Sequence, residues 1–169
     1  MSQSTAEHRA EAPHRVRCAV ITVSDTRTLA TDRGGPLIAE RLAAAGHEVV
    51  AREIVPDEPA TMRAILKNLG DRADVDAILM TGGTGVGRRD QTFETVSGLL
   101  EKSLPGYGEL FRMLSFEQVG PAAMLSRAIG GLMAGKILLT MPGSPAAVQL
   151  AMDRLIVPEL GHLVREARK

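Results

Sequence analysis

Short apolar runs alternate with longer segments of helical period along this chain, and this alternation constrains its fold more than any other feature. The runs occupy residues 17–23, 47–55, 76–81 and 136–141, and their length and composition are typical of buried strands. Strands that are separated by helices pair in parallel and are covered by helices on both faces. The sequence therefore predicts an α/β protein with three αβα layers around a mostly parallel sheet.

The helices between the runs are predicted from their period and from the residues that flank them. Gly34-Gly35-Pro36 opens the first helix, and Gly46 ends it at a position that favours glycine. The second helix begins after Asp57-Glu58-Pro59 and ends at Gly70. Further helices are expected over residues 92–102, 108–116, 121–127 and 146–164, the last with a bend near Pro158, and a further strand over 128–133.

The length of 169 residues suits one domain. Residues 1–14 are polar and lack an apolar period, so we expect them to form a flexible N-terminal arm. Residues 15–169 are predicted to form the single folded domain.

Composition argues against several classes of function. Twenty basic residues balance twenty acidic ones, and aromatic residues make up 2% of the chain. Binding to nucleic acid is not expected, because a basic excess and stacking side chains are both lacking. We find no apolar stretch long enough to span a membrane and no signal peptide, so a cytoplasmic protein is expected. The single cysteine, Cys18, lies in an apolar run and is expected to be a buried thiol.

Three polar or glycine-rich segments follow predicted strands directly: Ser24-Asp25-Thr26, Gly82 to Asp90, and Pro142 to Pro145. Because the carboxyl ends of parallel strands meet at one edge of a sheet, these loops should lie together there. Ligands bind at that edge in open α/β sheets. The sequence therefore predicts a ligand site formed by these three loops.

Glycines dominate the loop that follows the third strand, Gly82-Gly83-Thr84-Gly85-Val86-Gly87. Glycines let successive backbone N–H groups turn inward and form a site for an anion. The loop differs from a Walker A sequence, and Arg88 stands where a dinucleotide-binding loop has its third glycine. A tight turn would explain the glycines equally simply, but the place after a strand favours phosphate or carboxylate binding.

Two acidic residues near this edge allow two interpretations each. Asp90 precedes a helix and either caps it or binds Mg²⁺ beside phosphates. Asp57 also precedes a helix, and its position favours a cap while leaving a catalytic role open.

Two further features are weaker. Pro142-Gly143-Ser144-Pro145 either forms a rigid turn with a helix cap or lets the backbone approach a ligand closely. The four histidines lack the spacing of a metal site, so structural or solvent-facing roles are expected for them.

Taken together, these motifs resemble the molybdenum cofactor biosynthesis family that includes MoaB and MogA. The resemblance covers nearly the whole chain after the arm. It rests on Thr22-Val23-Ser24-Asp25, on Gly82-Gly83-Thr84-Gly85 with Arg89-Asp90, and on Met141-Pro142-Gly143-Ser144. The segment from Gly108 to Glu117, together with Leu125-Ser126-Arg127, is most similar to the MoaB branch.

The resemblance implies a molybdopterin-binding fold and a homo-oligomer, either a trimer or a hexamer. It also implies adenylylation of molybdopterin with ATP and Mg²⁺. Asp57 and Asp90 would then be the catalytic residues and the metal ligands, and Val55-Pro56-Asp57-Glu58 resembles the active branch. The substrate-binding residues that it implies are Thr22, Ser24, Asp25, Gly82, Gly83, Thr84, Gly85, Arg89, Ser115, Pro142, Gly143 and Ser144. Arg88 or Arg89 would add a cation that meets phosphate oxygens.

One residue departs from the family pattern, and two other functions compete with adenylyl transfer. Phe93 stands where the family usually has proline, which predicts a small change at the start of that helix. The first competitor is a pterin-binding protein without catalytic activity. The second is a nucleotide pyrophosphatase like those of competence-damage-type proteins, although the spacing of the glycine loop and Asp90 fits the cofactor branch better.

Overall fold

A six-stranded sheet with strand order β2-β1-β3-β6-β5-β4 forms the centre of the computed structural model, which describes residues 12–169. β1 (Arg17–Val23), β2 (Glu48–Val55), β3 (Ala77–Thr81) and β6 (Lys136–Met141) are parallel. β5 (Gly130–Met133) and β4 (Lys102–Ser103) are antiparallel at one edge. The predicted N-terminal arm lies largely outside the described residues.

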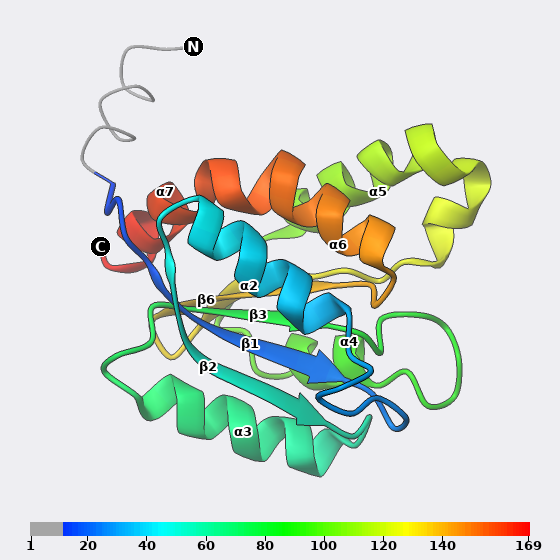
Figure 1. The fold of residues 1–169 in the computed structure, drawn as a ribbon, viewed down its shortest axis with the longest axis horizontal. Coiled ribbons are helices and arrows are strands. Elements are labelled where there is room, and N and C mark those ends of the chain that lie inside the picture. The colour runs from blue at the N-terminus through cyan, green and yellow to red at the C-terminus, as the bar shows by residue number, and fades with distance from the viewer. Residues whose placement is uncertain (1–11) are drawn as a thin grey trace.

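Helices cover both faces of the sheet, which confirms the predicted three layers (Figure 1). One face carries α2 (Gly34–Ala44), α5 (Pro105–Val119), α6 (Pro145–Ala151) and α7 (Val157–Ala167). The other carries α3 (Pro59–Asp71) and α4 (Thr92–Ser97). Two short segments complete the chain: a 3₁₀ turn, η1 (Gly120–Leu125), and a π-helical turn, η2 (Met152–Ile156).

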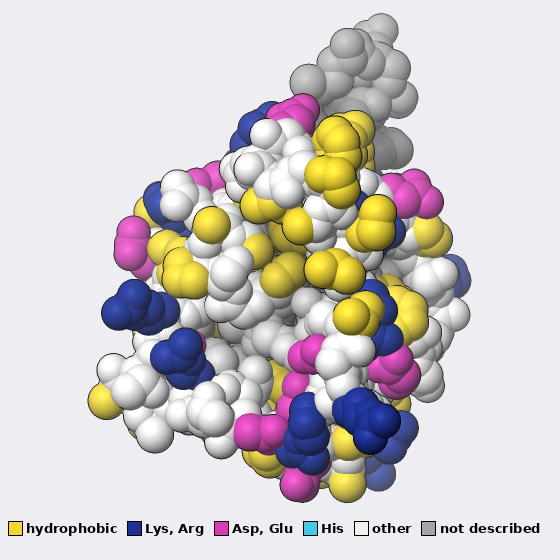
Figure 2. All heavy atoms as spheres, turned by 90° about the vertical axis from the view of Figure 1, so that its right-hand side faces the viewer, with side chains coloured by type: hydrophobic (Ala, Val, Ile, Leu, Met, Phe, Trp, Pro, Cys, Tyr) yellow, Lys and Arg dark blue, Asp and Glu magenta, His cyan; other side chains and the backbone are white. Residues whose placement is uncertain are grey.

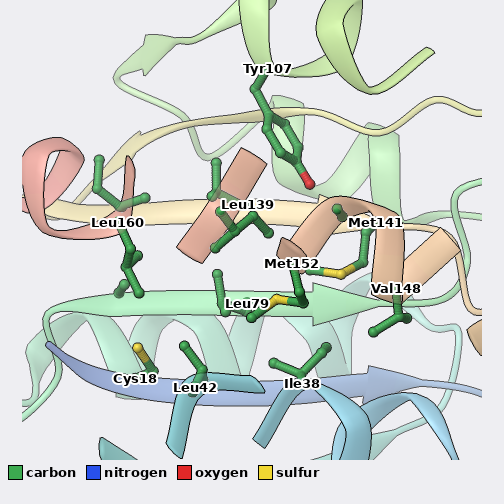
Figure 3. Close-up of a cluster of buried hydrophobic side chains, with 14 of the residues drawn as sticks. Cys18, Ile38, Leu42, Leu79, Tyr107, Leu139, Met141, Val148, Met152 and Leu160 are labelled. Carbon is green, nitrogen blue, oxygen red and sulfur yellow. The ribbon is translucent and has the colours of Figure 1, made fainter. Parts of the chain in front are cut away.

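The central strands are buried on both sides, as their continuous apolar sequences require. All five residues of β3 are buried, and six of the seven in β1 are. Figure 3 shows Ile38 of α2 and Val148 of α6 pointing toward the sheet. Leu79, on the central strand β3, belongs to the same core cluster. Cys18 belongs to this core, and burial raises the pKa of its thiol to about 12, so the expected buried thiol is confirmed.

Several predicted helix boundaries are wrong. The helices expected over residues 108–116 and 146–164 end three residues later than predicted, at Val119 and Ala167. The helix expected over residues 92–102 ends at Ser97, because the chain next turns at Gly98 and then pairs with β5 through Lys102 and Ser103. The helix expected over 108–116 begins earlier, at Pro105, a residue that suits a first helical turn. α3 continues one residue past Gly70, the predicted end.

The bend predicted near Pro158 takes the form of the η2 turn, which separates α6 from α7. Proline has no N–H to donate to the preceding turn, so the regular α-helical pattern is interrupted before it. Within residues 12–169, none of the helices combines the length and the apolar character needed to cross a membrane.

Candidate functional site

The three predicted loops meet at the carboxyl ends of β1, β3 and β6. The N–H of Gly82 donates to the carbonyl of Met141 at 3.0 Å, and the Thr81 hydroxyl donates to the carbonyl of Pro142 at 3.0 Å. The N–H of Ser24 donates to the Val55 carbonyl at 2.9 Å, which adds the end of β2 to the group. Parallel pairing alone therefore brings together loops that are far apart in the sequence.

The loop after β3 has a backbone that requires glycine. Gly82 has a φ of 103° and Gly83 a φ of 62°. A Cβ atom at Gly82 would collide with the Val23 carbonyl, and one at Gly83 would lie 2.5 Å from Asp57 Oδ2. The glycines thus permit both the left-handed turn and the close approach of a carboxylate.

Asp57 is buried and faces this loop. Its Oδ1 accepts a hydrogen bond from the N–H of Gln91 at 3.0 Å, and its own N–H donates to Asp25 Oδ1 at 3.0 Å. The residue before α3, Glu58, also makes no side-chain cap hydrogen bond. The interpretation of Asp57 as the cap of α3 is therefore wrong, because its carboxylate accepts the N–H of Gln91 instead and lies against Gly83. Burial, followed by the charges of Asp90 and Asp25, raises the pKa of Asp57.

Asp90 lies on the same loop. Its Oδ2 accepts a hydrogen bond from the N–H of Gly87 at 2.8 Å, and Cβ atoms at Gly85 or Gly87 would lie 2.8 Å from that oxygen. The cap position of α4 belongs to Gln91, which makes no side-chain cap bond, so Asp90 closes a turn and does not cap the helix. Among the described residues, no donor is bound to Asp90 Oδ1.

Arg89 pairs with Asp25 across the edge of the sheet. Its Nε and Nη2 atoms donate to the Asp25 carboxylate at 2.8–3.0 Å. The Asp57 N–H, followed by Arg89, lowers the pKa of Asp25. Asp25 therefore joins the first loop both to Asp57 and to the glycine loop. A role of Arg89 toward phosphate stays a prediction.

An apolar cleft of about 410 Å³ lies between the glycine loop and the segment formed by α5 and η1. Its wall of carbon side chains includes Phe111, Val119, Ala123, Leu125 and Leu150. Figure 2 looks onto this edge of the molecule, where hydrophobic side chains gather above a hollow and charged ones lie below and beside it. Such a cleft suits a flat heterocycle that is held by a few polar groups.

A second, polar cavity of about 570 Å³ adjoins the cleft and shares Gly82 and Gly143 with it. Two arginines, Arg27 and Arg33, line it. Asp32 lies at its base, where its carboxylate accepts hydrogen bonds from the Thr22 hydroxyl at 2.9 Å and from the N–H groups of Gly34 and Gly35 at 3.0 and 3.2 Å. Asp32 thereby satisfies the free N–H groups at the start of α2.

The predicted substrate-binding residues fall into three groups. The apolar cleft is lined by Gly82, Gly83, Thr84, Gly85, Ser115, Pro142, Gly143 and Ser144, and also by Asp90, which was predicted as a metal ligand. Thr22 and Ser24 line the polar cavity. Asp25 and Arg89 line neither cavity and form the ion pair beside them. Ser144 also caps α6, since its hydroxyl accepts from the Ala147 N–H at 3.3 Å, as the turn-and-cap interpretation predicts.

Sequence reasoning missed Arg27, Arg33 and Asp32. The two arginines could have been found as cations in a loop that follows a strand of a parallel sheet. Asp32 is harder to identify from the sequence, because its hydrogen-bond partner Thr22 lies earlier in the chain, within the predicted strand and not in the loop.

The acidic pair is the available donor set for a metal ion. Within residues 12–169, no group of three or more His, Cys, Asp or Glu side chains could hold one. Mg²⁺ needs fewer protein ligands, because it commonly binds through one or two carboxylates together with substrate phosphates. Asp57 and Asp90 fit that requirement, since both carboxylates face the glycine loop.

Comparison with known proteins places the chain among related sequences. A family model described as a probable molybdopterin binding domain matches residues 19–162. Molybdenum cofactor biosynthesis protein B of Halalkalibacterium halodurans is 54% identical over 167 residues, which cover 98% of each protein. The protein of that name from Bacillus subtilis is 51% identical over 168 residues, again 98% of each.

Solved structures agree. A crystal structure of a molybdenum cofactor biosynthesis protein B has a TM-score of 0.89 and 49% identity, and covers 93% of this chain and 98% of the other. The tungsten cofactor synthesizing protein MoaB of Pyrococcus furiosus has a TM-score of 0.80 and 35% identity, with coverages of 94% and 100%. CinA from Thermoplasma acidophilum shares the fold alone, at 18% identity, a TM-score of 0.54, and coverages of 88% and 98%.

Proposed function

The chain belongs to the molybdenum cofactor biosynthesis family, and we propose that it binds molybdopterin and transfers AMP to it from Mg-ATP. The observation that carries the proposal is the position of the two carboxylates. Asp57 and Asp90 both contact a glycine loop that borders an apolar cleft and, at Gly82, a polar cavity. A reaction between two phosphate-bearing heterocycles needs two adjoining sites, one for each molecule.

Each cavity matches a different part of the substrates. The apolar cleft would hold the pterin ring against Phe111 and Leu125, with Ser115 and the glycine loop available for hydrogen bonds. The polar cavity would hold the triphosphate of ATP, because Arg27 and Arg33 supply cations there. The shared glycines, Gly82 and Gly143, would let both phosphate groups approach the backbone closely.

The proposed reaction is nucleotidyl transfer. A terminal phosphate oxygen of molybdopterin forms a bond to the α-phosphorus of ATP. The bond from that phosphorus to the bridging oxygen breaks, and pyrophosphate leaves with the electron pair. The protein would contribute by positioning and charge neutralisation, with no covalent bond to the substrate.

Asp57 and Asp90 would hold Mg²⁺ in this reaction. When bound, Mg²⁺ neutralises part of the phosphate charge. Asp57 Oδ1 is fixed by the Gln91 N–H and Asp90 Oδ2 by the Gly87 N–H, so each acid enters the site with a set orientation. That preorganisation lowers the cost of binding a cation.

The decisive experiment incubates the purified full chain with molybdopterin, ATP and Mg²⁺ and measures adenylylated pterin. Formation of that product together with pyrophosphate is expected. Pterin binding without product would instead indicate the non-catalytic binding protein. Hydrolysis of a dinucleotide without any effect of pterin would indicate the pyrophosphatase.

We also propose a homo-oligomer, a trimer or a hexamer. Six large hydrophobic side chains on α5 and η1 are between 47% and 73% exposed: Leu110, Met113, Phe116, Val119, Met124 and Leu125. This set is called the α5–η1 face below. Soluble monomers seldom expose so many large apolar groups together, so the face suits contact between copies.

A further inference from the structure

Arg127 connects the two walls of the apolar cleft. It follows η1, whose residues Ala122, Ala123 and Leu125 line one wall. Its backbone N–H donates to the carbonyl of Thr84 at 3.0 Å, and Thr84 belongs to the opposite wall. The Arg127 side chain forms further hydrogen bonds to the segment that contains this wall.

The guanidinium of Arg127 binds three acceptors on the segment that carries Asp90. Nε donates to the Gly85 carbonyl at 2.8 Å, and Nη2 donates to the Asp90 carbonyl at 3.1 Å. Nη1 pairs with the carboxylate of Glu94 in the first turn of α4. A planar fork of donors is needed to reach acceptors in three directions.

The aromatic ring of Phe93 completes the surroundings of this guanidinium. The Arg127 Cζ lies 5.2 Å from the centroid of the ring, a distance that suits a cation–π interaction. This contact with the ring also holds the Arg127 side chain in place.

Arg127 itself lines neither the apolar cleft nor the polar cavity. Contact with a ligand in either cavity is therefore not its role. Within residues 12–169, the one hydrogen bond to the Asp90 carboxylate comes from the N–H of Gly87, which lies in the same loop, so this bond cannot position the loop as a whole. The bonds from Arg127 do so from outside the loop.

We propose that Arg127 is a positioning residue that sets the distance between the walls of the apolar cleft and places Asp90 relative to the pterin. Its effect on turnover rests on the adenylyl transfer proposed above, whereas its effect on the loop does not. A shift of about 1 Å in a catalytic group can cost about a hundredfold in rate. Without its guanidinium, Arg127 would lose two hydrogen bonds to the loop and one ion pair to α4, and we expect a shift of that size to follow.

The test compares Arg127→Lys and Arg127→Met with wild type, and uses Arg72→Met as the control. The Arg72 guanidinium pairs with Asp74 and donates to the Val50 carbonyl, so its bonds involve neither Arg127 nor the glycine loop. The primary measurement is hydrogen–deuterium exchange over residues 84–92. The N–H groups of Gln91 and Thr92 report on the loop, because they bond to Asp57 and to Gly83.

Exchange of these amides should be about tenfold faster in both Arg127 variants and unchanged in the control, while β1 stays protected in all four proteins. In the transfer assay, kcat should fall about a hundredfold and the Mg²⁺ concentration for half-maximal rate should rise, with the Kd for pterin within about threefold. A general loss of stability would not raise the Mg²⁺ requirement of the folded fraction.

Unchanged exchange in both Arg127 variants would overturn the proposal. So would faster exchange with wild-type kcat and Mg²⁺ dependence. If wild type adenylylates nothing, the adenylyl-transfer proposal fails. The exchange measurement then still decides whether Arg127 holds the loop.

Discussion

The carboxylate of Asp57 accepts a hydrogen bond from the backbone N–H of Gln91, 34 residues later in the chain, at 3.0 Å. This bond joins the loop after β2 to the segment that follows Asp90. Asp57 and Asp90 therefore both lie next to the backbone of Gln91, so their positions relative to each other are fixed. Their charges are close enough for Asp90 to contribute to the raised pKa of Asp57.

Replacement of Asp57 by asparagine separates catalysis from folding. The amide oxygen of the new side chain can still accept the Gln91 bond, but the change removes a negative charge from the proposed metal site. We expect adenylyl transfer to fall about a hundredfold or more, with pterin binding retained. The measurement is product formation together with pterin affinity, and a transfer rate equal to that of wild type would exclude Asp57 from the reaction.

The raised pKa of Asp57 also predicts the pH dependence of stability. An acid whose pKa is higher in the folded state favours folding while it is protonated, and that contribution is lost as the pH rises through the folded pKa. Asp57→Asn should therefore melt at or above the wild-type temperature at neutral pH, and the difference should vanish in acid. Thermal unfolding at a series of pH values checks the sign of this difference in melting temperature. A variant that melts below wild type at neutral pH but together with it in acid would contradict the prediction.

Replacement of Asp90 by asparagine should nearly abolish adenylyl transfer with little change in melting temperature. The amide oxygen can accept the Gly87 N–H bond in place of Oδ2, so the turn is preserved while the charge is lost. Asp74→Asn is the control, since Asp74 is an exposed acid paired with Arg72 far from the loop. Turnover at the wild-type rate in the Asp90 variant would remove this residue from the mechanism.

The mostly parallel sheet and the meeting of three loops at one edge could be predicted, because both follow from the alternation of apolar runs with helices; the strand order was not predicted. The partners of single side chains could not be predicted. Neither the spacing of Asp57 nor its place before a helix indicates a bond to Gln91, which depends on how two loops cross. The early end of α4 has a similar origin, since β4 exists through its pairing with β5. Tertiary contacts outweigh local propensity at both places.

The contacts of Arg127 could not be predicted from the sequence either. The sequence includes it in a motif, Leu125-Ser126-Arg127, but no periodicity relates it to Gly85 or Asp90. Its carbonyl partners lie 42 and 37 residues away and use backbone groups, which every residue carries. Residue type alone therefore cannot identify them.

Asp76 provides a test of stability at the opposite end of the sheet. Burial alone would raise its pKa, but hydrogen bonds from the Arg17 side chain and N–H and from Arg168 outweigh that effect and hold the pKa at about 2. A lowered acid pKa stabilises the fold above the unfolded value and loses that effect as the pH falls toward about 2. Asp76→Asn should lower the melting temperature by several degrees at neutral pH and much less in strong acid; equal losses at both would contradict the ion-pair explanation.

The α5–η1 face provides the last prediction. Phe116 is 58% exposed and lines one groove of this face with Met113 and Met124, so a charge at this position would have to be buried in a contact that covers the face. A buried unpaired carboxylate is costly, and Phe116→Glu should therefore dissociate the oligomer. Leu29→Glu is the control, because Leu29 is 67% exposed but lies in the loop after β1, away from α5. Sedimentation equilibrium at micromolar concentration should give a multiple of 18.0 kDa for wild type and for the Leu29 variant, and a species of 18.0 kDa for the Phe116 variant. An 18.0 kDa species for wild type would show that the face is exposed in a monomer, and an intact oligomer for Phe116→Glu would place the contact elsewhere.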